Sequence, residues 1–115
     1  MGMSSDLDIL RDVSGRLDSA GIPFMVTGSV AMNYYAQPRM TRDIDLVVAL
    51  NESHAETIMR LFAEDYYLDR QAIARAISQH SVFNLIHYET VIKVDFIVLK
   101  NGVGELLDRA RQHDE

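Results

Sequence analysis

Two aspartates open an apolar run near the middle of the chain. Asp43 and Asp45 flank a single residue in the sequence DIDLVVAL, which otherwise has the composition of a buried strand. Because side chains alternate along a strand, both carboxylates would point to the same face. At a separation of about 5 Å and an effective dielectric constant of about 20, their repulsion is about 3 kcal/mol. A partner must offset this cost, and paired oxygen ligands in a chain without cysteine suit a hard cation such as Mg²⁺.

A second feature is the expected strand-to-helix turn at Gly28 and Ser29, in the sequence VTGSVAMNYYA. Free backbone N–H groups and the positive end of a helix would meet there, and this arrangement holds phosphate oxygens. Gly28 permits the backbone to approach a phosphate closely, and the hydroxyl of Ser29 can add a hydrogen bond to it. Many such turns carry Gly-Ser for conformational reasons alone. The turn therefore indicates phosphate binding only in combination with the aspartates.

A third feature is Asp95, which lies within the apolar run KVDFIVL. Alternation places Lys93, Asp95 and Ile97 on one face of the predicted strand. A lone acid in such a strand is costly, and Lys93 could neutralise it. If the strand lies beside DIDLVV, Asp95 becomes a third carboxylate of the same cluster. Divalent ions and a nucleoside triphosphate would then offset the repulsion between the acids.

The paired aspartates also have a structural interpretation. They could be solvated acids at the entrance of a strand, paired with Arg39 or Arg42. They precede their apolar run, whereas the reactive acids of open parallel α/β folds follow it. The sequence therefore disfavours an aspartate site of the phosphatase or receiver type.

The remaining pattern predicts the elements that must position these residues. Apolar periodicity and turn residues indicate the order helix, strand, helix, strand, helices, hairpin, helix. We expect Asn51 to cap a helix that runs to about residue 63, and Asp69 to cap the next short helix. The apolar runs between residues 82 and 99 predict a β-hairpin. The expected fold is α/β (α+β), with a small mixed β-sheet flanked by helices.

Composition and charge restrict the class of protein. The 115 residues predict a single domain over residues 1–115, and the hydrophobic share of 48% predicts a globular one. No apolar window has the length of a membrane span, and no secretion signal or cysteine is present, so we expect a cytoplasmic protein that binds no membrane. The net charge of −6 predicts that any nucleic acid is contacted through a short end or with the help of another subunit.

Taken together, Gly28-Ser29, the Asp43-x-Asp45 motif after thirteen intervening residues, and Asp95 resemble the polymerase-β-type nucleotidyltransferase superfamily. The segments TGSVAMNYYAQPRMTRDIDLVV and VFNLIHYETVIKVDFIV are similar to minimal prokaryotic members, which include the AbiE-type nucleotidyltransferase toxins. The likeness extends over about residues 24 to 110. It implies the nucleotidyltransferase fold.

The resemblance also implies catalytic roles. Asp43 and Asp45 would hold two Mg²⁺ ions, for which Mn²⁺ can substitute, between the triphosphate and the attacking hydroxyl. Asp95 would ligate the catalytic ion and help to deprotonate the acceptor. All three carboxylates would therefore be both metal ligands and catalytic residues.

Four further residues are implied in nucleotide binding. Gly28 and Ser29 would bind the β- and γ-phosphates of the NTP, and Arg39 and Lys93 would meet the remaining triphosphate charge. The implied reaction transfers a nucleoside monophosphate to a hydroxyl of an RNA end, a protein or a small molecule, and it releases pyrophosphate.

The resemblance leaves the partners and the activity open. Toxin-type members usually carry a further helical portion that shapes the acceptor site, so we expect a partner subunit, as in toxin–antitoxin pairs, or a homo-oligomer. The alternative to an enzyme is a non-catalytic nucleotide-binding or antitoxin-like subunit on the same fold, although the presence of all three acids favours activity. Asp-x-Asp also occurs in metal-dependent glycosyltransferases, whose domains generally need a far longer chain.

Overall fold

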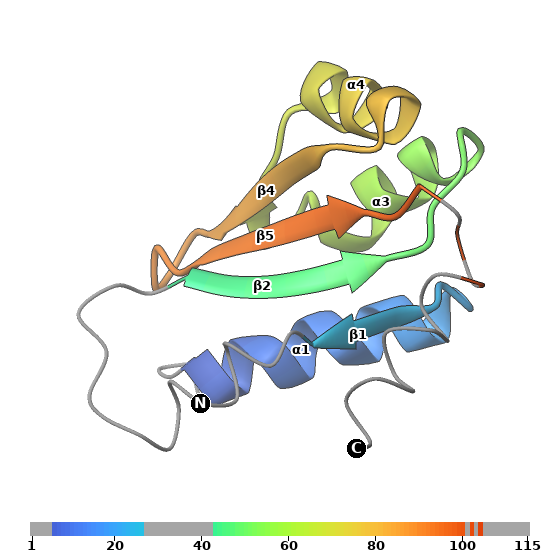
Figure 1. Ribbon diagram of the computed structural model, residues 1–115. Helices are drawn as coiled ribbons and strands as arrows, with labels where there is room; N and C mark the ends of the chain where they lie inside the picture. Colours follow the sequence, from blue (N-terminus) through green and yellow to red (C-terminus); the bar gives the residue numbers. More distant parts are fainter. Residues whose placement is uncertain (1–5, 27–42, 101, 103, 105–115) are drawn as a thin grey trace.

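The computed structural model describes residues 6–26, 43–100, 102 and 104 of the chain, and Figure 1 shows their arrangement. The helix predicted after Ser29 and most of the last predicted helix lie outside these residues. The described elements follow in the order α1 (Asp6–Ser19), β1 (Phe24–Val26), β2 (Asp43–Val48), α3 (His54–Phe62), β3 (Tyr66–Tyr67), α4 (Arg70–Gln79), β4 (Val82–His87) and β5 (Lys93–Val98). Within the described residues, no helix combines the length and the apolar character needed to cross a bilayer.

The strands form one five-stranded mixed sheet in the order β1-β2-β5-β4-β3. β2 and β5 run parallel, side by side, and every other pair is antiparallel (Figure 1). The predicted hairpin is confirmed as β4 and β5, which places β5 at the centre of the sheet. The predicted fold class, a small mixed sheet flanked by helices, is confirmed as well.

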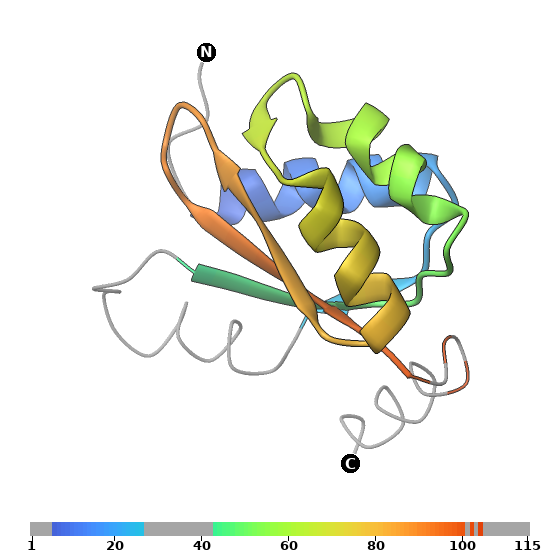
Figure 2. The ribbon, with the colours of Figure 1, turned by 90° about the horizontal axis from the view of Figure 1, so that it is seen from above.

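The described helices all cover the same face of the sheet, which we call the helix face (Figure 2). Alternate residues of β2 and β5 point into it because side chains alternate along a strand. They pack against apolar residues of α1, α3 and α4 in one continuous core. The buried residues that the two central strands contribute are Ile44, Leu46, Val48, Val94, Phe96 and Val98.

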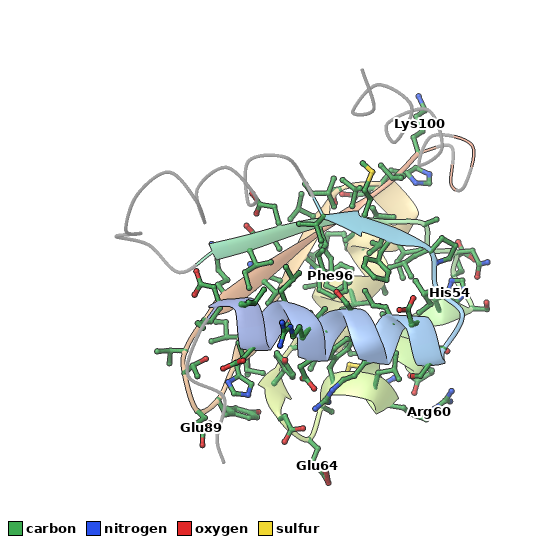
Figure 3. All side chains as sticks on the ribbon, turned by 90° about the horizontal axis from the view of Figure 1, so that it is seen from below. His54, Arg60, Glu64, Glu89, Phe96 and Lys100 are labelled. Carbon is green, nitrogen blue, oxygen red and sulfur yellow. The ribbon has the colours of Figure 1, made fainter. Side chains whose placement is uncertain are left out.

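Aromatic rings fill the middle of this core. The ring of Phe62 meets those of Tyr66 and Phe96 edge to face, with centroids 5.4 and 5.9 Å apart. The ring of Phe83 on β4 also packs against Phe96, with centroids 5.0 Å apart. Figure 3 shows Phe96 in the interior between the sheet and α1. Because such rings bury a large area and prefer these tilted contacts, the cluster is a main source of stability.

Arg16 connects α1 to the end of α3. Its guanidinium donates to the carbonyl of Leu61 at 2.7 Å and to the carboxylate of Asp65 at 2.5 Å, and it pairs with Asp12 at 3.1 Å. The same group lies over the ring of Phe62. Burial alone would lower the pKa of Arg16, but the hydrogen bond to Asp65 and the charge of Asp12 outweigh it and raise the pKa. The arginine therefore stays charged in this network.

The helix caps were predicted with mixed success. Asp69 is confirmed as the cap of α4, because its carboxylate accepts from the N–H groups of Gln71 and Ala72. The predicted cap at Asn51 is wrong, since α3 begins at His54 and Ser53 occupies the capping position. The side chain of Asn51 instead accepts from the N–H of Ser53 at 3.0 Å and closes a turn before the helix.

Candidate active site

The two central strands bring two of the predicted acids together. β2 and β5 pair in step, so that Asp45 lies directly opposite Asp95 and Asp43 opposite Lys93. Paired residues of neighbouring strands point to the same face, and adjacent strands lie about 4.8 Å apart. The carboxylates of Asp45 and Asp95 therefore project side by side from the face opposite the helices. We call this side of the sheet the acid face.

β4 adds an amide to the same line of residues. Asn84 lies opposite Asp95 in the antiparallel pairing of β4 with β5, so that Asn84, Asp95 and Asp45 form one row across three strands. We call these three residues the acid row. Their side chains are accessible, because Asn84 is exposed and the two aspartates are only half-buried. Solvent and ions can reach all three.

The acid row lies between two other rows on the acid face. These rows follow from the same register, and they are largely apolar apart from Lys93 and Asp43. On one side are Tyr67, Ile86, Lys93 and Asp43, and on the other are Val82, Ile97, Val47 and Met25. Asn84, Asp95 and Asp45 thus form one line, with Lys93 in the row on one side and Ile97 and the buried Val47 in the row on the other.

Lys93 lies close to the acid row. Its ammonium is 3.9 Å from a carboxylate oxygen of Asp95, and the two side chains are 40% and 23% exposed. An ion pair of this length and exposure contributes about 0–1 kcal/mol to stability. The contact agrees with the interpretation in which Lys93 neutralises Asp95. The side chain of Lys93 is also flexible and partly exposed, so its ammonium can turn toward an anionic ligand.

Several predicted site residues lie outside the described part of the chain. Gly28, Ser29 and Arg39 are among them, so their roles stay predictions. Asp43 begins β2, but the described atoms do not include its side chain. The roles assigned to Asp43, Asp45, Asp95 and Lys93 also stay predictions, although the backbone register of all four is now known.

The donor set of the acid row fits a hard cation. Two carboxylates and an amide supply oxygen ligands of the kind that Mg²⁺ and Mn²⁺ prefer, and they are accessible to water, which Mg²⁺ retains in its coordination shell. Among the described side chains, no group of three or more His, Asp or Glu residues is placed to hold a metal ion. A site with three carboxylates would need Asp43 in addition to the described pair.

Sequence reasoning left Asn84 and Tyr67 without a role. The signal for Asn84 was the alternation in VFNLIHY, which assigns Val82, Asn84 and Ile86 to one face of the strand. The alternation alone did not identify the neighbouring strand, and only the pairing with β5 shows that this face is the acid face. His87, on the opposite side of the strand, is buried in the helix face and bonded to the Thr90 hydroxyl at 2.9 Å, so it is a structural residue.

Comparisons with known proteins add little to this geometry. No protein-family model matches the chain, and no curated protein does. One similar solved structure is that of a candidate nucleotidyltransferase, TM1012, from Thermotoga maritima, with 24% sequence identity and a TM-score of 0.47. The match covers 84% of this chain and 61% of that chain, so this chain spans less than two thirds of its length. Likeness at this level carries no weight for the function.

Proposed function

We propose that the chain is a metal-dependent nucleotidyltransferase, which moves a nucleoside monophosphate from an NTP to a hydroxyl acceptor. The observation that carries the proposal is the pairing of Asp45 with Asp95 on neighbouring parallel strands, both on the acid face. Two half-buried carboxylates held side by side repel each other, and a protein gains from such an arrangement when the pair binds a cation. The sequence resemblance supplies the reaction class.

Asp45 and Asp95, with Asp43 as the proposed third ligand, would hold Mg²⁺ or Mn²⁺. Bound there, the metal would neutralise charge on the triphosphate and lower the pKa of the attacking hydroxyl. The donor atoms are oxygens that project from two adjacent strands, so the sheet fixes their spacing before any ligand arrives. Preorganisation of this kind is the contribution that the fold makes to the reaction.

The chain's own residues would manage the proton and the phosphates. Asp95 would accept the proton of the acceptor hydroxyl, whose oxygen then forms a bond to the α-phosphorus. The bond from that phosphorus to the bridging oxygen breaks, and pyrophosphate leaves. Lys93 would exchange its contact with Asp95 for one with the triphosphate. Gly28 and Ser29 are proposed to bind the β- and γ-phosphates, and Arg39 is proposed to meet triphosphate charge. β1 ends at Val26, which pairs with Leu46 next to Asp45.

The proposal is tested by transfer of labelled nucleotide. The protein is incubated with Mg²⁺ and each α-labelled NTP, alone and with RNA or protein acceptors, and labelled product is separated from free nucleotide. Transfer should be lost in Asp45→Asn and Asp95→Asn and retained in the control Glu64→Gln, which removes an exposed acid outside the acid face. Absence of both transfer and Mg-NTP binding in the unmodified chain would overturn the proposal.

A non-catalytic nucleotide-binding or antitoxin-like subunit is the second candidate. The contact between Lys93 and Asp95 favours it, because an acid that is already paired needs no metal. Tight Mg-NTP binding without transfer to any acceptor would support this candidate. Three expectations stay predictions of the sequence: the relation to AbiE-type toxins, the partner subunit or homo-oligomer, and the cytoplasmic location. Adding a candidate partner protein to the same assay tests the expectation of a partner subunit.

A further inference from the structure

The turn between β4 and β5 exposes apolar side chains outside the acid row. Residues 88–92 connect the two strands. Tyr88 is 60% exposed and Val91 is 72% exposed, so this short turn holds two of the four large apolar side chains that the described residues expose. The other two, Tyr67 and Val82, lie on the acid face. The exposed side chains of the turn therefore need an explanation of their own.

Val91 is strained as well as exposed. Its φ is 53°, in the left-handed region that β-branched residues rarely adopt. The next residue, Ile92, is completely buried, whereas the side chain of Val91 remains in solvent. Backbone strain of this kind persists where the surrounding structure enforces it, and it is concentrated at functional sites. A contact with a partner would bury the valine that the isolated chain leaves exposed.

Hydrogen bonds hold the turn in one conformation. The N–H of His87 donates to the carbonyl of Ile92 at 2.9 Å, and the N–H of Val91 donates to the carbonyl of His87 at 2.8 Å. The ring of His87 accepts from the N–H of Thr90 at 3.3 Å and lies 2.9 Å from the Thr90 hydroxyl. His87 itself is buried, and its ring packs against Tyr66. Because the backbone is already ordered, binding through this turn loses little conformational entropy.

Acidic side chains lie beside the turn. The N–H of Tyr88 donates to the carbonyl of Asp65 at 3.1 Å, which places the loop after α3 next to the β4–β5 turn. Asp65 is paired with Arg16, and Glu64 and Glu89 add two exposed acids. Both glutamates project from the lower edge of the molecule in the view of Figure 3. We call this region the turn surface, and it consists of Tyr88, Val91, Glu64, Asp65 and Glu89.

The charge of the turn surface restricts the kind of partner. Acidic groups repel phosphates, which disfavours nucleic acids and anionic membranes. Contact between two copies through this surface would bring Glu64 and Glu89 of one copy against those of the other, in chains that each carry a net charge of −6. An apolar pocket bordered by Lys or Arg on a different protein matches both the exposed side chains and the charge.

We infer that the turn surface docks a different protein, which offers an apolar pocket bordered by Lys or Arg. Tyr88 and Val91 enter the pocket, and the acids of the turn surface face the cations around it. Tyrosine is enriched among the residues that contribute most to protein interfaces. The inference goes beyond the proposed function and does not depend on it, because the turn surface contains no residue of the acid row.

The first experiment identifies the partner by cross-linking. Tyr88 is replaced by benzoylphenylalanine, which bonds covalently to a neighbouring molecule on irradiation, and the chain is added to an extract of the cells that produce it. The same replacement at Tyr67, which is 53% exposed on the acid face, is the matched control. We expect one protein to be cross-linked from position 88 and not from position 67, and mass spectrometry identifies it. Absence of such a protein, or a product that joins two copies of the chain, would overturn the inference.

The second experiment measures the affinity of the chain for the purified cross-linked protein. Tyr88→Ala should raise the Kd about tenfold, the effect of truncating a residue that contributes to an interface. Val91→Thr keeps the β-branched shape, removes apolar character and should raise the Kd about fivefold. Tyr67→Ala should leave it unchanged. The Kd should rise with salt concentration, and combining Glu64→Gln with Glu89→Gln should weaken that dependence.

Each outcome bears on the inference separately from the proposed function. Equal Kd values for the unmodified chain, Tyr88→Ala and Val91→Thr would overturn the inference, as would a Kd that does not depend on salt. Urea unfolding verifies that both variants are folded, and both should bind Mg-NTP as the unmodified chain does. Loss of Mg-NTP binding in the folded variants would also overturn the inference, because the turn would then serve the nucleotide. Failure of the unmodified chain to bind Mg-NTP would end the proposed function and leave the docking result in place.

Discussion

The two faces of the sheet use the same strand for different purposes. On β5, Val94, Phe96 and Val98 are buried against helices, while Lys93 and Asp95, which alternate with them in the sequence, remain half-buried on the opposite side. The first set contributes stability by burying apolar area. Asp95 costs stability, because its carboxylate lies opposite the like charge of Asp45 on the adjacent strand. On β5, the apolar burial of one face thus offsets the loss of stability that the charges on the other face cause.

Charges are also treated differently on the two sides. Near the helix face, Arg16 is paired with both Asp12 and Asp65, and the Tyr66 hydroxyl donates to Asp12 at 2.6 Å. These charged and polar groups are thus hydrogen-bonded or ion-paired with one another. In the acid row, two carboxylates face the same way with one lysine nearby at 3.9 Å. The charges near the helix face are therefore paired within one network, whereas the acid row places two carboxylates side by side next to Lys93.

The largest expected effect comes from removing one charge of the acid row. Asp45→Asn should lower nucleotide transfer by about 10³-fold, because loss of a metal ligand removes several kcal/mol of transition-state stabilisation. The free energy of unfolding should stay the same or rise by up to about 1 kcal/mol, since a repulsion disappears. Labelled transfer and urea unfolding measure the two quantities. A variant that loses stability together with activity would show that Asp45 is structural.

The fold could be predicted further than the site. Alternating apolar residues in DIDLVV and KVDFIVL identified both strands and both buried faces, because burial on one side of a strand imposes a period of two. The same pattern contains no information on which strands are neighbours. The opposition of Asp45 and Asp95, and the position of Asn84, depend on the register of β2, β5 and β4, which is fixed by the core as a whole.

The second prediction contrasts the two faces on adjacent residues of β5. Phe96→Ala should lower the free energy of unfolding by about 4 kcal/mol, because it removes a fully buried ring at the centre of the aromatic cluster. Ile97→Ala, on the acid face and only half-buried, should cost less than half as much. Chemical denaturation of both variants provides the comparison. Equal losses would mean that the acid face is as tightly packed as the helix face.

The third prediction concerns pH and Tyr66. Burial and the hydrogen bond to Asp12 raise the pKa of Tyr66 above its ordinary value of 10.0. The unfolded chain therefore releases this proton first as the pH rises. The stability contributed by protonated Tyr66 is complete below about pH 10 and declines above it.

Tyr66→Phe tests this effect directly. The variant should lose about 1.5 kcal/mol at neutral pH, the scale of a hydrogen bond to a charged acceptor. With both proteins at the same ionic strength, the stability of Tyr66→Phe should fall less steeply between pH 9 and pH 11 than that of the unmodified chain. Tyr67→Phe is the matched control, because it removes the hydroxyl of an exposed tyrosine on the acid face. Parallel curves for Tyr66→Phe and the unmodified chain would contradict the assignment.

The smallest expected effect concerns the hairpin turn between β4 and β5, outside both faces of the sheet. It is a gain in stability, whereas the two preceding predictions are losses. Val91 has a φ of 53° and is 72% exposed, so a β-branched residue adopts a left-handed conformation without burying its side chain. Val91→Gly keeps the N–H that donates to the carbonyl of His87 and removes the conformational strain. We expect a gain of about 1 kcal/mol and a melting temperature a few degrees higher. His80→Gly, at a φ of 54° but without β-branching, should gain less. If Val91→Gly instead lowers stability, the exposed valine contributes contacts that outweigh its strain.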